Sequence, residues 1–96
     1  MNDVVFAVGK LRDLFEAAKV AKTECDKAAV FAAVTVITDF LNAEIGERDD
    51  YVGENIDRAR DGIGAIVGYA VTNGHGTEQH VSWALAAIMF LEDKVK

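Results

Sequence analysis

The chain has 96 residues, of which 51% are hydrophobic and none is proline, and this composition predicts one helical domain over residues 1–96 rather than a turn-rich β fold. Its formal net charge of −6 leaves no basic stripe to neutralise phosphates, so we expect no direct contact with DNA or RNA. The longest uncharged stretches span 11 to 16 residues, short of the ~20 that a membrane helix needs, so we expect no membrane span.

One cysteine and the order of the first charges indicate the compartment. Cys25 has no second cysteine to pair with, which favours a reducing interior. Asp3 precedes the first apolar run and Lys10 follows it, the reverse of a secretory signal peptide. We therefore expect a cytoplasmic protein, in a bacterial cell or an infected host cell. Cys25 itself we interpret as a half-buried structural thiol.

The first half of the chain predicts two helices. The first begins at Asn2 or Asp3, and its apolar residues recur every three or four positions. They are Val4, Val8, Leu11, Phe15 and Ala18. A second helix begins near Thr23 and runs to about Glu44. Because residues 28–38 are apolar on nearly all sides, we expect this helix at the centre of the core.

The second half predicts two more helices. Gly46 ends the second helix, and the acidic residues 47–50 lead into a third. Its apolar stripe consists of Val52, Ile56, Ala59, Ile63, Ile66 and Ala70. Residues 65–72 are ambiguous between helix and strand, and the continuity of the stripe favours helix. The glycine-rich residues 73–76 are a stop signal, after which Thr77 caps a fourth helix.

These elements predict an all-α fold, a four-helix bundle built from two antiparallel helical hairpins. So small a bundle cannot readily hide all its uncharged helix surface, so we expect a homodimer. The surplus is assigned chiefly to residues 79–91 of the last helix. The predicted interface combines aromatic residues with small residues that allow close helix approach. Its members are Trp83, Ala87, Phe90, Gly64 and Gly68.

No group of residues predicts catalysis, a metal or a cofactor. His75, Glu78 and His80 lie close together in the sequence, but the two histidines lack the i, i+4 spacing that directs two rings at one ion. The glycines at 62, 64 and 68 lack the preceding strand of a dinucleotide-binding loop. An enzyme would require His75, His80 or Cys25 to meet in one pocket. The sequence therefore predicts a protein that is not an enzyme.

Acidic residues are concentrated in the middle of the chain. Residues 44–61 carry a net charge of −4 out of −6. Glu54 and Arg58 have the spacing of a stabilising helix pair, and a solvated acidic face is the simplest interpretation of the segment. The functional interpretation is a patch that docks on a basic surface of a protein partner. This predicted acidic patch consists of Glu47, Asp49, Asp50, Glu54 and Asp57.

Without a catalytic pattern, binding is the expected function. In size, acidity and lack of catalytic residues the chain is similar in type to small phage-encoded counter-defence proteins, anti-CRISPR inhibitors among them. That resemblance implies an inhibitor or adaptor that occludes a surface of a larger complex. Toxin and bacteriocin immunity proteins are an alternative. A further alternative is an oligomeric helical protein that sequesters a small ligand or signalling nucleotide, with Trp83 or Tyr69 stacking on it.

Overall fold

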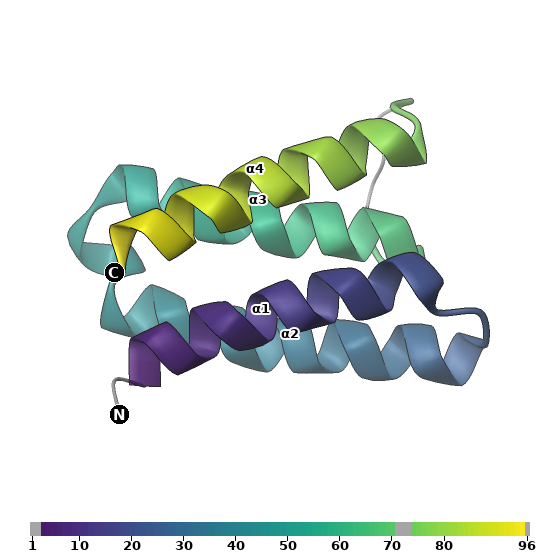
Figure 1. Cartoon of the computed structure of the whole chain (residues 1–96), viewed down its shortest axis with the longest axis horizontal. Coiled ribbons are helices and arrows are strands. Elements are labelled where there is room, and N and C mark those ends of the chain that lie inside the picture. Colours follow the sequence, from purple (N-terminus) through teal and green to yellow (C-terminus); the bar gives the residue numbers. More distant parts are fainter. Residues whose placement is uncertain (1–2, 71–73, 96) are drawn as a thin grey trace.

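A computed structural model of the chain describes residues 3–70 and 74–95, and these residues form α-helices with one short 3-10 turn (Figure 1). The elements are α1 (Asp3–Val20), α2 (Glu24–Glu44), η1 (Gly46–Arg48), α3 (Asp50–Val67) and α4 (Thr77–Lys94). No strand occurs within the described ranges. The prediction of an all-α fold is confirmed.

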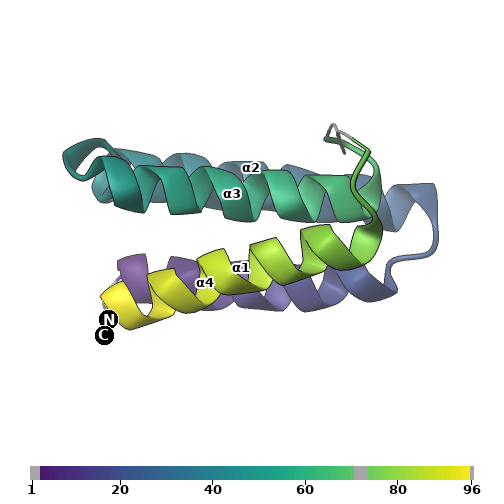
Figure 2. The ribbon, with the colours of Figure 1, turned by 90° about the horizontal axis from the view of Figure 1, so that it is seen from above.

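The helices surround one core. Figure 1 shows α3 beside α4 and α1 beside α2, and Figure 2 shows that α2 and α3 form one layer while α1 and α4 form the other. The radius of gyration of 12.4 Å matches the ~12.5 Å expected for a compact domain of this length. Every helix contributes buried side chains, the largest being Phe15, Leu11, Leu41, Ile56, Ile63, Ile88 and Leu91. None of the helices in the described part of the chain has the length and hydrophobicity of a bilayer-spanning helix.

Side chains before α2 and α3 fix where these helices begin. The Oγ1 atom of Thr23 accepts a hydrogen bond of 3.0 Å from the backbone N–H of Asp26. A carboxylate oxygen of Asp49 accepts hydrogen bonds from Tyr51 N–H at 3.0 Å and Val52 N–H at 3.3 Å. Both residues therefore satisfy donors that the first turn of a helix leaves open. At α4 the cap is the backbone of Gly76, so the predicted capping role of Thr77 is wrong.

Helix α3 ends earlier than its apolar stripe predicts. Gly68 adopts the left-handed conformation with φ +89°, and the N–H of Tyr69 donates a 2.7 Å hydrogen bond to the carbonyl of Gly64. This is the glycine-terminated helix end that the stripe did not reveal. The extension of the helix to Ala70 is therefore wrong. The rest of the ambiguous segment, and the stop at Asn73, lie outside the described residues.

An ion pair joins the first helix to the last. The Arg12 guanidinium donates from Nε to Glu92 Oε2 at 2.8 Å and from Nη2 to Glu92 Oε1 at 2.6 Å. Such a two-bond pair holds both partners in a defined geometry. The hydrogen bond with Glu92 is the main cause that raises the pKa of Arg12 above its ordinary value. Arg12 therefore carries its charge throughout the pH range in which the contact forms.

Helix α2 is less buried than its composition predicts. One side of it, with Val34 and Leu41, is fully buried in the core. The opposite side is in solvent, and Val36 there is 68% exposed. The reason is that α2 contacts α1 and α3 but not α4, so it occupies a corner of the molecule rather than its centre. The expectation of a central α2 is therefore corrected, and part of the surplus apolar surface lies on this helix.

Candidate functional site

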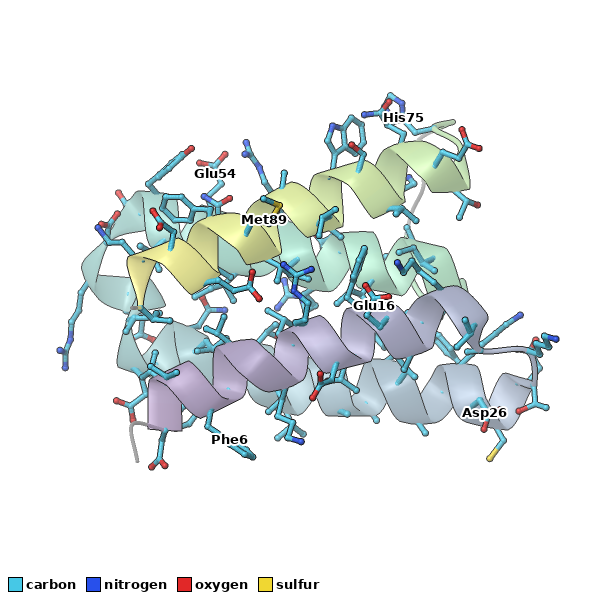
Figure 3. The ribbon with its side chains drawn as sticks, viewed as in Figure 1. Phe6, Glu16, Asp26, Glu54, His75 and Met89 are labelled. Atoms are coloured by element: carbon cyan, nitrogen blue, oxygen red, sulfur yellow. The ribbon has the colours of Figure 1, made fainter. Side chains whose placement is uncertain are left out.

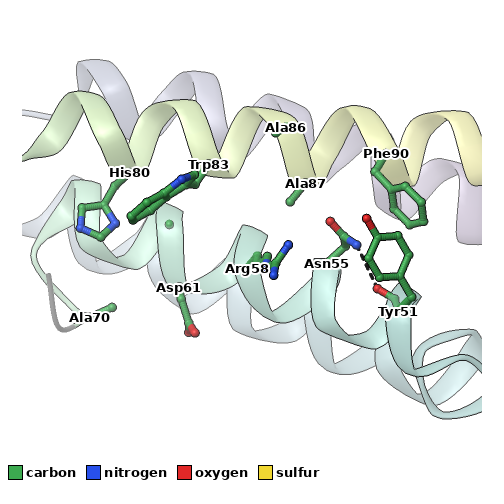
Figure 4. A pocket seen from close by; sticks show the side chains of 11 residues that line it. Tyr51, Asn55, Arg58, Asp61, Ala70, His80, Trp83, Ala86, Ala87 and Phe90 are labelled. Atoms are coloured by element: carbon green, nitrogen blue, oxygen red, sulfur yellow. Dashed lines mark hydrogen bonds between the residues drawn. The ribbon is translucent and has the colours of Figure 1, made fainter. Parts of the chain in front are cut away.

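A groove of about 870 Å³ lies at the outer junction of α3 and α4 (Figure 4). On each helix its residues recur every three or four positions, so one face of each helix lines it. Helix α3 contributes Tyr51, Asn55, Arg58, Asp61 and Gly62, and α4 contributes His80, Trp83, Ala86, Ala87 and Phe90. Ala70, which follows α3, completes the lining. We call this feature the α3/α4 groove.

Small residues create this groove. A Cβ atom added at Gly62 would lie 2.7 Å from the Ala84 Cβ and 3.2 Å from the His80 carbonyl oxygen. The glycine therefore allows α4 to approach α3 closely, since no other residue fits there. Farther along α4, Ala86 and Ala87 leave the space between the larger side chains of Trp83 and Phe90 unfilled.

Aromatic rings stand at both ends of the groove (Figure 4). At one end the Trp83 ring, 43% exposed as a residue, makes edge contacts with His75 at 4.8 Å and His80 at 5.5 Å between centroids. At the other end Tyr51 and Phe90 form an edge-to-face pair at 4.9 Å. Edge-to-face contacts of this kind hold rings in place while leaving one of their faces accessible. The groove therefore has two ordered aromatic ends.

Polar groups reach the groove from α3. Asn55 is only 4% exposed, and its Nδ2 donates a 2.9 Å hydrogen bond to the Tyr51 carbonyl. Figure 4 shows its amide oxygen on the side that faces α4, and within the described part of the chain this oxygen accepts no hydrogen bond. Arg58 Nη2 donates to Glu54 Oε1 at 2.7 Å, which confirms the predicted helix pair. Asp61 is exposed at the rim.

Most of the predicted acidic patch gathers on the outer side of α3. A shallow depression of about 560 Å³ there is lined by Asn42, Gly46, Glu47, Asp50, Gly53, Glu54 and Asp57. Four of the five predicted carboxylates therefore meet, and we call them the acidic depression. The fifth, Asp49, is absent from the lining because it caps α3. Since Glu54 lines the depression and pairs with Arg58 of the groove, the two features adjoin across α3.

The predicted interface residues do not form one surface. Trp83, Ala87 and Phe90 line the groove, with Ala87 only 2% exposed at its floor, whereas the two glycines do not. Gly64 is buried under the ring of Phe31, which a Cβ would approach to 2.8 Å. Gly68 is exposed, and its function is to end α3. Gly64 therefore packs against another helix of this chain, which corrects its placement on a surface.

The remaining side chains considered for ligand or metal binding either lie apart from one another or already contact other side chains of the chain. Tyr69 stacks on Phe31 with ring centroids at 5.4 Å, so its ring is already paired. The rings of His75 and His80 are 6.1 Å apart and nearly perpendicular. In the described ranges no three His, Cys, Asp or Glu residues are placed to hold a metal ion. Cys25 is exposed on the first turn of α2, which corrects its interpretation as half-buried.

Sequence reasoning missed the α3 side of the groove. Tyr51, Asn55 and Arg58 follow the helical spacing of one face, but they are chemically unlike and differ in polarity. This face of α3 becomes part of a groove only because the fold places it opposite Trp83 and Phe90 of α4. Comparison of the chain with protein-family models, with curated proteins and with solved structures finds no match.

Proposed function

We propose that the protein is a non-enzymatic binding protein that acts by covering a surface of a larger protein complex. The observation that supports this function is the adjacency of the α3/α4 groove and the acidic depression on the two sides of α3. Occlusion is also how the counter-defence and immunity proteins that it resembles in type would act.

The two features have complementary roles in such binding. Half-exposed aromatic residues such as Trp83 and Tyr51 are the kind of side chain that supplies most of the free energy of an interface. Carboxylates such as Glu54 and Asp57 speed the approach of a basic partner and orient it. An interface that uses both is specific because a partner must match the ring positions and the charge together.

We further propose two antiparallel hairpins, α1 with α2 and α3 with α4, and a homodimer formed through the outer face of α2. This placement differs from the interface expected from the sequence. It is supported by the absence of charge in residues 28–38 and by the 68% exposure of Val36. Two copies related by a twofold axis would pack this face against itself and leave the α3/α4 groove open to another protein.

A second candidate function is the binding of a small ligand or signalling nucleotide. The groove volume of about 870 Å³ favours it, because ligand sites commonly occupy ~300 to 1,000 Å³. A thermal-shift screen with nucleotides separates the two functions. A saturable rise in melting temperature would support the small ligand, and no rise would support the protein partner.

The main experiment is affinity purification from a lysate of the cells that produce the protein. One variant carries lysine in place of Glu47, Asp50, Glu54 and Asp57. The matched control carries lysine in place of four exposed carboxylates of α1 and α2, namely Asp13, Glu16, Asp39 and Glu44. We expect the first variant to lose the partner and the control to keep it. Equal recovery of the same partner by both variants would contradict the proposed function.

A further inference from the structure

We propose that the α3/α4 groove binds a basic amphipathic α-helix of the partner protein. This inference depends on the proposed function and names the partner segment that the groove accepts. The apolar side chains of the incoming helix lie over Ala86 and Ala87, and its basic side chains lie along the acidic side of α3.

The dimensions of the groove fit a helix. Tyr51 and Asp61, which line the two ends of its α3 side, are ten residues apart, or ~15 Å along the helix axis. Trp83 and Phe90 are seven residues apart, or ~10 Å. That distance equals the i to i+7 separation of anchors on an amphipathic helix that binds in a groove.

The floor of the groove suits a row of aliphatic side chains. Ala86 and Ala87 keep the space between Trp83 and Phe90 open, and the rings close it at both ends. The buried amide of Asn55 adds a polar atom to this apolar surface, with its oxygen on the side facing α4. This oxygen is an acceptor for a hydroxyl or ammonium group at one position of the incoming helix.

Charge on the two sides of the groove is unequal, which defines the chemistry of the occupant. On the α3 side Arg58 and Asp61 line the groove itself, and the carboxylates Asp50, Glu54 and Asp57 lie beyond them in the adjoining acidic depression. The α4 rim is uncharged from residue 79 to residue 91. An incoming helix therefore needs lysine or arginine on the edge next to α3 and apolar residues toward α4. Such a helix is basic on one side only, so the groove also determines its orientation.

A second copy of the chain does not provide this segment. Within their bounds α2, α3 and α4 are net acidic and α1 is neutral, so no helix of the chain is net basic. A copy placed in the groove would bring like charges together along α3, which is unfavourable. The charge pattern therefore points to a different protein as the source of the helix.

The only tryptophan of the chain reports directly on occupancy, because Trp83 lines the groove. The probe is a synthetic tryptophan-free helical peptide of about 14 residues, with leucine at i, i+3, i+4 and i+7 positions, lysine along one edge of that face and uncharged residues elsewhere. One control peptide has the same composition with the leucines scattered around the helix. Another keeps the leucine face and carries glutamate in place of lysine. We expect only the first peptide to give a saturable blue shift of Trp83 fluorescence.

Two protein variants test whether the groove itself is the site. Ala86→Phe fills the groove at an exposed helix position, and Ala32→Phe makes the same change on the exposed side of α2. We expect Ala86→Phe to weaken binding of the basic peptide at least about tenfold and Ala32→Phe to change it less than about twofold.

Several results would overturn the inference. They are equal binding of the scattered-leucine peptide, unchanged affinity of Ala86→Phe, and no binding of any peptide. Dissociation of a wild-type dimer by Ala86→Phe would identify a second copy as the occupant. A blue shift with nucleotides alone would identify a small ligand. The lysate experiment judges the proposed function separately, since it depends on the acidic depression and requires no helix in the groove.

Discussion

The outer face of α2 and the α3/α4 face both expose apolar side chains, but they differ in shape and charge. Within residues 28–38 of α2 the exposed residues are alanines and Val36, which is 68% exposed, and none of them lines the groove or the acidic depression. On the α3/α4 face Trp83 and Tyr51 stand at a groove that adjoins the carboxylates of the acidic depression. Figure 3 shows the two regions on different halves of the molecule, with Glu54 and His75 on one and Asp26 on the other.

This difference shows that the amount of exposed apolar surface does not by itself identify the partner. A flat, uncharged surface made by one helix can be buried equally well by an identical surface, which suits a second copy. A groove with rings at fixed separation and charge on one rim requires a matching segment. The two faces therefore predict two kinds of association, and each can be removed without the other.

Replacing Gly62 by alanine should have the largest effect on the α3/α4 face. The added Cβ would lie 2.7 Å from the Ala84 Cβ and 3.3 Å from its Cα, and this backbone cannot move aside without separating the helices. We expect the free energy of unfolding to fall by about 2 kcal/mol, measured by urea denaturation. Gly9→Ala is the control, since nothing lies within 4 Å of its Cβ, and it should raise stability by about 0.5 to 1 kcal/mol. Equal stability of Gly62→Ala and wild type would contradict the close approach.

Gly64→Ala provides a comparison on the α2 side of α3. There the added Cβ would lie 2.8 Å from the ring of Phe31 and 3.0 Å from the Ala70 Cβ, but the half-buried ring can rotate away and Ala70 lies beyond the end of α3 rather than in a packed helix. The loss of stability should therefore be smaller than for Gly62→Ala.

Periodicity predicted the helices well because it records which face is buried. Val8, Leu11 and Phe15 recur at helical spacing, and all three are fully buried in α1. The end of α3 could not be predicted in this way. The helical spacing of apolar residues continues past Gly68, but the helical conformation of the backbone ends there. A glycine within an apolar stripe is compatible with a helix interior and with a left-handed helix end. Tertiary contacts at that point decide between them.

The candidate site was predicted only in part, for a related reason. Trp83 and Phe90 were expected at a surface because they share a side of the last helix, and both line the groove. Their partner Tyr51 lies in another helix, and no sequence pattern shows that the two helices place these rings together. Gly64 was assigned to the surface as a small residue, but small residues mark close helix packing whether the other helix belongs to the same chain or to another. Here it belongs to the same chain.

Val36→Glu tests the α2 face alone. If two copies pack through this face, the substitution places two carboxylates in an apolar contact, and the dissociation constant of the dimer should rise at least about tenfold, or about 1.4 kcal/mol. Sedimentation velocity over a range of protein concentrations measures this change. Because Val36 is 68% exposed in the single chain, the helical circular dichroism should not change. Binding of the basic peptide should also stay within about twofold of wild type. A dimer that persists unchanged would exclude the α2 face as its interface.

Asp49→Ala separates charge from structure within the predicted acidic patch. Asp49 accepts hydrogen bonds from the N–H groups of Tyr51 and Val52 and so caps α3, whereas Asp57 lines the acidic depression. We expect Asp49→Ala to lower the free energy of unfolding by about 1 kcal/mol, measured by urea denaturation, and to change peptide affinity little at temperatures where the protein is folded. Asp57→Ala should weaken peptide binding and change stability by less than about 0.5 kcal/mol. If Asp49→Ala weakened peptide binding and Asp57→Ala lowered the free energy of unfolding, both assignments would be wrong. Asp49 must therefore be kept in the variant that reverses the charge of the acidic depression. With the cap of α3 intact, a loss of binding reflects the changed surface charge rather than a disrupted start of α3.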